Sequence, residues 1–377
     1  MFLRSLKLNR LLSFGPDAEA VELRPLNVLI GPNGSGKSNF IEAISLLKAA
    51  PKDLAVPIRE GGGTAEWLWK GNSTGHAAVE AVTNVWIRHQ FAFIAVNHRL
   101  HLTNERIADI GEDGTADVPY FNFANSREAT LYGNRDESVI INFDREQSVL
   151  SQVKGPNYPG LGMLAEYYED IRLYRDFTFG RRSPARRPQP ADLPTDHLME
   201  NAENLGLILN KFRRDIPTKK ALIEGLKKVF DGITDFSVQV EANTAQIFLE
   251  EEGWTIPATR VSDGTMRWLS LLAILLDPNP PALVCIEEPE LGLHPDLMNP
   301  LARLLKDASE RMQIIITTHS EALVGAFTET PEDVLVCERR DGSTTMQRLD
   351  REQLSEWLEE YSLGQLWSKG ILGGNRW

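Results

Sequence analysis

The sequence has few cysteines, no long apolar run and fewer basic than acidic residues. Only Cys285 and Cys337 occur in 377 residues, too few for a disulfide framework or a four-ligand zinc site. Both lie in apolar runs, so we expect them in the core of a cytoplasmic protein. No apolar stretch approaches the roughly 20 residues that cross a bilayer, and no membrane insertion is expected. The 40 lysines and arginines against 53 acidic residues give a net charge of −13, which disfavours a chain whose main role is coating nucleic acid.

An ordinary globular composition, with 42% apolar and 25% charged residues, predicts a folded protein of one large or two intimate domains. The apolar periodicity predicts strands at 2–14, 21–23 and 26–30, followed by a helix from Lys37 to Ala50. It then predicts several antiparallel strands in 77–107 and helices in 161–230. An exposed Arg/Pro-rich loop at 179–190 interrupts this helical region. Helices at 267–276, 297–309 and 322–327 then alternate with strands at 282–286, 313–317 and 334–337. This alternation predicts an α/β fold with a mostly parallel sheet covered on both faces.

A phosphate-binding loop is the strongest motif. Two glycines bracket four residues and are followed by Lys and Ser, in the segment Gly31, Pro32, Asn33, Gly34, Ser35, Gly36, Lys37 and Ser38. A strand precedes the loop and a helix follows it, so backbone N–H groups and the positive helix end would face an anion. Lys37 would bridge the outer phosphates, and the Ser38 hydroxyl would ligate Mg²⁺.

Acidic residues follow the apolar strand 282–286. Carboxylates at the C-terminal end of a parallel strand lie where ligands bind in such sheets. Glu287 could hold Mg²⁺ directly or through water, and Glu288 could polarise the water that attacks the γ-phosphate. The alternative is a solvated acidic strand end.

Two further segments are candidates for phosphate contacts. His319 ends the strand 313–317 and could hydrogen-bond the γ-phosphate or the attacking water, although a single histidine is more often structural. Ser262, Asp263 and Gly264 precede an apolar helix, where Ser262 and the Gly264 backbone are good phosphate donors. Taken alone, Ser-Asp-Gly is an ordinary helix cap.

The order of these four motifs resembles that of ABC-type ATPases. The N-terminal segment 2–7 and the segment from Asn33 to Asn39 resemble the RecF, SMC and OLD branch, in its stand-alone bacterial AAA-family group. The resemblance implies an ABC-type head with a mostly parallel core sheet, an antiparallel β layer, an inserted helical lobe and, since heptads are absent, no long coiled coil. We expect an N-terminal ATPase lobe at 1–150, an inserted mainly helical lobe at 151–255, a C-terminal ATPase lobe at 256–345 and a tail at 346–377.

In this family, ATP lies between the phosphate loop of one head and the signature segment of a second, so the resemblance implies a head-to-tail homodimer. It assigns Ser262, Asp263 and Gly264 to the partner's γ-phosphate, Glu288 to catalysis and His319 to the switch. The segment 291–295 would couple the two sites. Gln147 and Gln152 are both candidates for the metal-sensing glutamine, and Glu287 stands where the family has aspartate. No GTP-specific Asn-Lys-x-Asp motif is present, which favours ATP.

Three roles for the ATPase remain open. Closure of the dimer could gate a separate effector chain, a nuclease or toxin, as in two-component bacterial anti-phage modules, because the stretch after His319 is too short for an OLD-type nuclease domain. Alternatively, the dimer could be a RecF-like DNA clamp in repair, with phosphate contacts from an arginine group consisting of Arg172, Arg175, Arg181, Arg182, Arg186 and Arg187. A transporter role fits the signature and the N-terminal strand least well.

Overall fold

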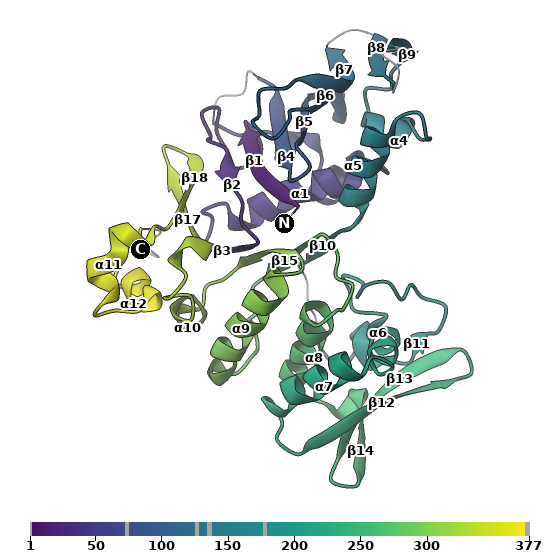
Figure 1. Cartoon of the computed structure of the whole chain (residues 1–377), viewed down its shortest axis with the longest axis vertical. Coiled ribbons are helices and arrows are strands. Elements are labelled where there is room, and N and C mark those ends of the chain that lie inside the picture. Colours follow the sequence, from purple (N-terminus) through teal and green to yellow (C-terminus); the bar gives the residue numbers. More distant parts are fainter. Residues whose placement is uncertain (1, 72–74, 125–127, 134–137, 176–178, 374–377) are drawn as a thin grey trace. The chain divides into compact units, whose positions relative to one another are not determined.

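The structure is a computed structural model that describes residues 2–71, 75–124, 128–133, 138–175 and 179–373. The chain divides into two compact units (Figure 1). Unit 1 comprises residues 1–171, 332–351 and 370–377, and unit 2 comprises residues 172–331 and 352–369. The two units are therefore built from interleaved parts of the sequence.

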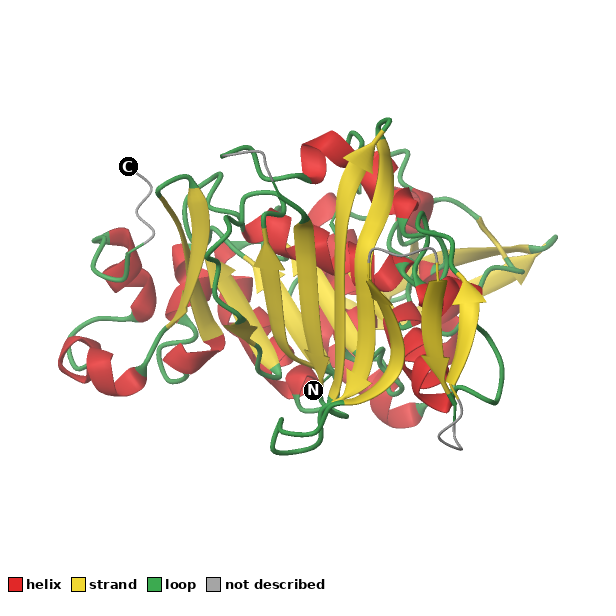
Figure 2. Cartoon of the chain, turned by 90° about the horizontal axis from the view of Figure 1, so that it is seen from above, coloured by secondary structure: helices red, strands yellow, loops and turns green. Residues whose placement is uncertain are grey.

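Unit 1 contains an eight-stranded antiparallel sheet, whose strands are drawn in yellow in Figure 2. Its order is β2-β1-β4-β5-β6-β7-β8-β9, with strands β1 (Leu3–Asn9), β2 (Val21–Glu22), β4 (Ala77–Thr83), β5 (Ile87–Val96), β6 (Arg99–Asp109), β7 (Val118–Ala124), β8 (Glu128–Tyr132) and β9 (Ser138–Asn142). Alternate residues of β5 are buried, as expected for a sheet with one face on a core. The antiparallel strands predicted for 77–107 are confirmed.

A second set of strands in unit 1 carries the phosphate loop. β3 (Leu26–Ile30) is fully buried and pairs in parallel with β17 (Val334–Arg340), which continues into the antiparallel β18 (Ser343–Arg348). The helices of the unit are α1 (Lys37–Ala49), α2 (Ala55–Glu60), α3 (Thr64–Trp67), α4 (Val149–Gln152) and α5 (Pro159–Glu169). α5 packs against α1 and α4. Pro51 follows α1 closely, consistent with the predicted end of this helix.

Unit 2 is built around a parallel pair of buried strands, β15 (Leu283–Glu287) and β16 (Gln313–Thr317). Its main helices are α6 (Leu205–Phe212), α7 (Ile216–Lys227), α8 (Asp263–Leu275), α9 (Met298–Ser309), α10 (Glu321–Gly325) and α12 (Leu363–Ser368). Two of the sequence boundaries between the units, 171/172 and 351/352, fall within β10 (Ile171–Tyr174) and α11 (Arg351–Leu358). The parallel pairs in both units confirm the predicted α/β class.

Unit 2 also contains a small antiparallel sheet that the sequence analysis does not predict. It consists of β11 (Gln189–Pro190), β12 (Ile233–Glu241), β13 (Thr244–Glu251) and β14 (Trp254–Pro257). Helix α6 packs on β12 and β13, and α7 packs on β12 and on α8 (Figure 1). The segment 151–255 is therefore mixed, not mainly helical. In β12 and β13, buried apolar residues alternate with mostly polar ones, as expected for strands, and both strands lie beyond 161–230, the range predicted to be helical.

The described residues contain no extended helix. The longest helices in the described ranges, α1 and α8, each have 13 residues. This agrees with the expected absence of a long coiled coil. Within the same ranges, no helix combines the length and apolarity needed to span a bilayer.

Candidate active site

The phosphate loop of unit 1 joins β3 to α1 and depends on glycine at two close approaches. Gly31 and Gly36 have φ angles of 145° and 103°, which favour glycine. A Cβ on Gly31 would lie 2.2 Å from the Cys337 carbonyl oxygen, and one on Gly36 would lie 2.2 Å from the Thr344 hydroxyl. These contacts explain why the motif requires glycine there. They also show that the β17–β18 hairpin forms one side of the loop.

Lys37, at the start of α1, reaches back over the loop. Its ammonium group donates hydrogen bonds to the carbonyl oxygens of Gly31 (2.8 Å) and Pro32 (2.9 Å). The first turn of α1 contains no acidic residue that would oppose an anion. The Ser35 hydroxyl is buried with no hydrogen-bond partner among the described residues. A buried donor, a lysine ammonium and a helix N-terminus fit a phosphate group.

Thr344 supports the phosphate loop from the hairpin. Its hydroxyl lies 2.9 Å from the Ser35 carbonyl oxygen and 2.7 Å from the Ser13 hydroxyl, and its backbone N–H donates to the Ser13 carbonyl at 2.8 Å. Because a carbonyl oxygen can only accept, the Thr344 hydroxyl is the donor in its contact with Ser35. Thr344 is 2% exposed, so these contacts are shielded from water. Thr344 could not be predicted from the sequence, because it belongs to no motif.

In unit 2, the predicted acidic residues and histidine lie together at the ends of β15 and β16. Glu288 has a left-handed backbone (φ 46°), and its N–H donates to the Thr317 carbonyl at 3.0 Å. Its carboxylate lies 3.8 Å from Nε2 of His319. Both side chains retain solvent access, at 41% and 27% exposure. A strained backbone at a partly exposed acid–imidazole pair is typical of a catalytic position.

Glu290 connects the acidic segment to the segment that carries His319. One carboxylate oxygen, Oε1, accepts hydrogen bonds from the Thr318 hydroxyl (2.6 Å) and the His319 backbone N–H (3.0 Å). The other oxygen is buried without a hydrogen-bond partner among the described residues. Burial raises the pKa of Glu290 above its ordinary value, although the two hydrogen bonds act in the opposite direction. Glu290 therefore fixes the position of His319.

Two arginines contact this acidic segment from other parts of unit 2. Arg267 on α8 donates from Nη2 to the Glu288 carbonyl oxygen at 2.8 Å. Burial lowers the pKa of Arg267, and the charges of Glu290 and Glu288 partly offset that effect. Arg175 donates from Nε to Oε1 of Glu287 at 2.8 Å. Arg267 has no motif that predicts this contact, and the sequence places Arg175 in the arginine group proposed for DNA contact.

The signature segment begins α8. Ser262 is the N-cap, and its hydroxyl oxygen accepts the Thr265 backbone N–H at 3.1 Å. Asp263 and Gly264 are the first two helical residues. A Cβ on Gly264 would lie 2.9 Å from the Gly292 carbonyl oxygen, within the segment 291–295. The backbone at Gly264 therefore lies close to the segment that the resemblance assigns to coupling.

The Arg/Pro-rich stretch at 179–190 is not simply an exposed loop, and this prediction is wrong in part. Arg181, Arg182 and Arg187 are exposed, but Arg186 is 3% exposed. Its guanidinium lies among backbone carbonyl groups of unit 2, so it is unavailable for DNA. Charge and proline content predicted exposure, but could not reveal these acceptors.

The two candidate metal-sensing glutamines have different contacts in unit 1. Gln147 accepts a hydrogen bond from the Leu54 N–H at 3.2 Å and donates one to Asp53 at 2.8 Å. The hydrogen bond to Asp53 is the main cause of the lowered pKa of Asp53. Gln152 donates to the backbone oxygens of Asp144 and Gln147, both at 2.9 Å. These contacts do not distinguish between the two candidates.

The residues present suit Mg²⁺ brought in with a nucleotide. Within the described ranges, no three His, Cys, Asp or Glu side chains are grouped to hold a metal ion. Mg²⁺ commonly uses only one or two protein ligands together with phosphate oxygens and water. The predicted ligands are a hydroxyl, Ser38 in unit 1, and a carboxylate, Glu287 in unit 2, both of which are the oxygen donors that Mg²⁺ prefers.

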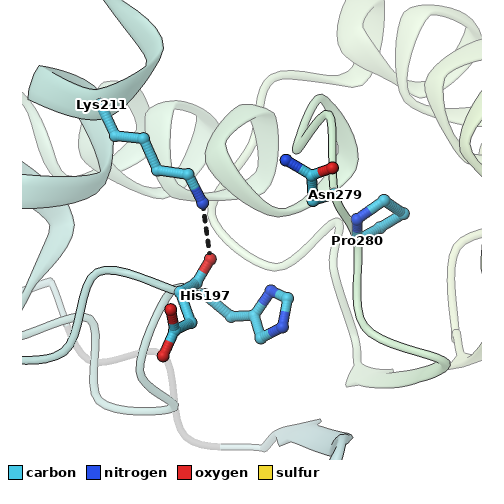
Figure 3. Close-up of a pocket in the computed structure, with 5 residues that line it drawn as sticks. His197, Lys211, Asn279 and Pro280 are labelled. Atoms are coloured by element: carbon cyan, nitrogen blue, oxygen red, sulfur yellow. Dashed lines mark hydrogen bonds between the residues drawn. The ribbon is translucent and has the colours of Figure 1, made fainter.

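A separate pocket in unit 2 has a volume of about 600 Å³ (Figure 3). It is lined by Asp196, His197, Lys211, Asn279 and Pro280. Lys211 donates to the Asp196 backbone oxygen at 2.9 Å. The lining includes none of the predicted nucleotide-site residues.

Comparison with solved structures defines the class of fold. An Smc head bound to the C-winged helix domain of ScpA has a TM-score of 0.56 and 15% identity, over 94% of this chain and 99% of the other. An Smc head with an extended coiled coil, bound to the C-terminal domain of ScpA and derived from Pyrococcus furiosus, has a TM-score of 0.55 and 14% identity, over 95% and 99% of the two chains. The fold is that of an SMC-type ATPase head.

The family follows from the sequence match. The chain belongs to the family described as "AAA domain, putative AbiEii toxin, Type IV TA system", which matches residues 26–76 and 163–325, more than half of the chain. The predicted membership of the AAA-family group is thereby confirmed, and the predicted ABC-type head agrees with the fold of the Smc heads. No protein of curated function matches the chain significantly.

Proposed function

We propose that this protein binds ATP with Mg²⁺ and hydrolyses it to ADP and phosphate. The observation that supports this most directly is the pairing of Glu288 with His319 at the strand ends of unit 2, in a chain whose other unit carries an intact phosphate loop. Lys37 and the loop N–H groups bind the phosphates. Glu288 accepts a proton from the attacking water, and His319 hydrogen-bonds the γ-phosphate or that water.

Mg²⁺ bound by Ser38 and Glu287 would neutralise charge on the phosphate oxygens. Arg175 donates from Nε to Oε1 of Glu287, and a carboxylate has about four acceptor positions. Glu287 can therefore keep this ion pair while contacting a metal or its water.

We further propose that ATP binding drives a head-to-tail homodimer, in which Ser262, Asp263 and Gly264 of one copy face the nucleotide on the other. Dimer closure would gate a separate effector protein, a nuclease or toxin, in anti-phage defence. The toxin–antitoxin description of the family and the binding of ScpA by the similar Smc heads support a partner of this kind.

Two substitutions test the nucleotide chemistry. Lys37→Ala removes charged hydrogen bonds to phosphate and should weaken ATP binding at least about tenfold. Glu288→Gln should retain ATP, lower turnover about 100-fold or more and accumulate dimers. ATP affinity, phosphate release and light-scattering mass would be measured beside Glu310→Gln, an exposed control on unit 2. Normal turnover by Glu288→Gln would refute the role assigned to Glu288.

A RecF-like DNA clamp is the second candidate. The exposed side chains of Arg181, Arg182 and Arg187 favour it, because they remain available for phosphate contacts. Arg186 no longer supports this candidate, and Arg175 is paired with Glu287.

A further inference from the structure

One arginine side chain in unit 2 is buried against the segment that begins α8. Arg186 is 3% exposed and lies in the short helix η1 (Pro184–Arg186). That helix contacts η2 (Ala258–Arg260), which immediately precedes the signature segment. A buried guanidinium is costly unless its donors are satisfied, so its partners indicate what it stabilises.

The partners of Arg186 surround the start of the signature. Nε donates to the Phe179 carbonyl oxygen at 2.7 Å, and Nη1 donates to the Ala258 carbonyl oxygen at 2.8 Å. Nη1 also contacts the Val261 carbonyl oxygen, and Nη2 forms an ion pair with the Asp263 carboxylate. Arg186 therefore holds the residues on both sides of Ser262.

We infer that Arg186 is a positioning residue for the signature segment. It fixes this segment in place and neutralises the charge of Asp263, so that the segment can contact the ATP bound by a second copy of the chain. This inference rests on the proposed function, because only a nucleotide presented by another copy requires that surface. It also gives the Arg/Pro-rich stretch a role other than DNA contact.

Charge at Asp263 provides the physical reason. An anionic residue at the start of a helix is favourable for that helix, but it repels a polyphosphate brought to the same helix end. The Asp263 side chain is 69% exposed, whereas Arg186 beside it is buried. The buried positive charge of Arg186 therefore reduces the repulsion between the Asp263 carboxylate and a polyphosphate, while the Arg186 side chain takes up no exposed surface. Ser262 is exposed next to Asp263, so its hydroxyl can still donate to a phosphate.

The test measures ATP-dependent dimerisation in the Glu288→Gln background. Arg186→Met should leave the affinity of the monomer for ATP within about twofold, because the phosphate loop is intact. It should weaken dimerisation about tenfold or more through loss of charged hydrogen bonds and exposure of the Asp263 charge. Adding Asp263→Asn to the Arg186→Met variant should raise its dimer affinity several-fold, which recovers part of the loss. Arg214→Met, at an exposed arginine outside this stretch, is the matched control and should dimerise like the parent.

Each outcome separates the alternatives. A parent that stays monomeric with ATP overturns the proposed dimer, and the inference falls with it. A dimerising parent with an equally dimerising Arg186→Met variant overturns only the inference. If Arg186→Met weakens dimerisation but Asp263→Asn restores nothing, charge neutralisation is refuted. Urea unfolding of every variant gives its folded fraction, and dimerisation is measured only where each variant is at least 95% folded. Weaker dimerisation then cannot result from loss of folded protein.

Discussion

Thr344 offers a sharp test of how the phosphate loop is held, because its hydroxyl can be removed with little change of shape. Thr344→Val retains the β-branch but leaves the buried Ser35 carbonyl without the donor seen at 2.9 Å. Leaving a buried polar group unsatisfied costs about 1–3 kcal/mol. If this cost falls on the loop conformation that binds phosphate, the ATP dissociation constant should rise about 5- to 150-fold.

Titration with ATP, paired with urea unfolding, measures both quantities on the same protein. Thr345→Val is the matched control, since Thr345 is exposed on the same strand and should leave affinity unchanged. A variant that loses about 1–3 kcal/mol of unfolding free energy while binding ATP normally would refute the reasoning. In that case Thr344 stabilises the fold of unit 1 and has no part in preparing the loop for phosphate.

Two further predictions concern unit 2. Burial raises the pKa of Glu290 above its ordinary value of 4.5. Between these two pKa values the folded protein retains a proton that the unfolded chain releases, so the free energy of unfolding falls as pH rises through this range. Glu290→Gln should remove this decline, so the Tm of the variant relative to that of the parent should increase across this pH range. A Tm difference between variant and parent that does not change with pH would contradict the prediction. Replacing Arg181, Arg182 and Arg187 together by alanine should reduce the salt dependence of any DNA binding by about 0.9 in the log–log slope per lost phosphate contact, and an unchanged slope would exclude these residues from a DNA site.

The parts of this fold with a strong local signal could be predicted from sequence. The phosphate loop, the buried strands β3, β15 and β16, and the helices that follow them combine glycine, apolar runs and helical periodicity in short segments. The pairing of Glu288 with His319 was also predictable in outline, because parallel strands end at the same edge of a sheet.

The contacts that support these residues could not be predicted in the same way. Arg186, Arg267 and Thr344 each bond to backbone carbonyl groups of segments far away in the chain. A backbone carbonyl is available at every residue, so no residue type in the partner segment indicates such a contact. The burial of Arg186 was also hidden by its exposed neighbours Arg182 and Arg187, which gave the whole stretch the appearance of a solvated loop.

The C-terminal segment, which the sequence analysis treats as a tail, contributes structure to both units. The end of β18 and the start of α11 belong to unit 1, next to the hairpin residue Thr344 that contacts the phosphate loop, and residues 374–377 lie outside the described ranges. In unit 2, helix α12 packs on α10, the helix that directly follows His319. A Cβ on Gly364 would lie 2.2 Å from the Glu321 carbonyl oxygen, so the two backbones touch. The chain from β17 to α12 therefore contacts the phosphate loop in unit 1 and the helix that follows His319 in unit 2, although it contains no nucleotide motif.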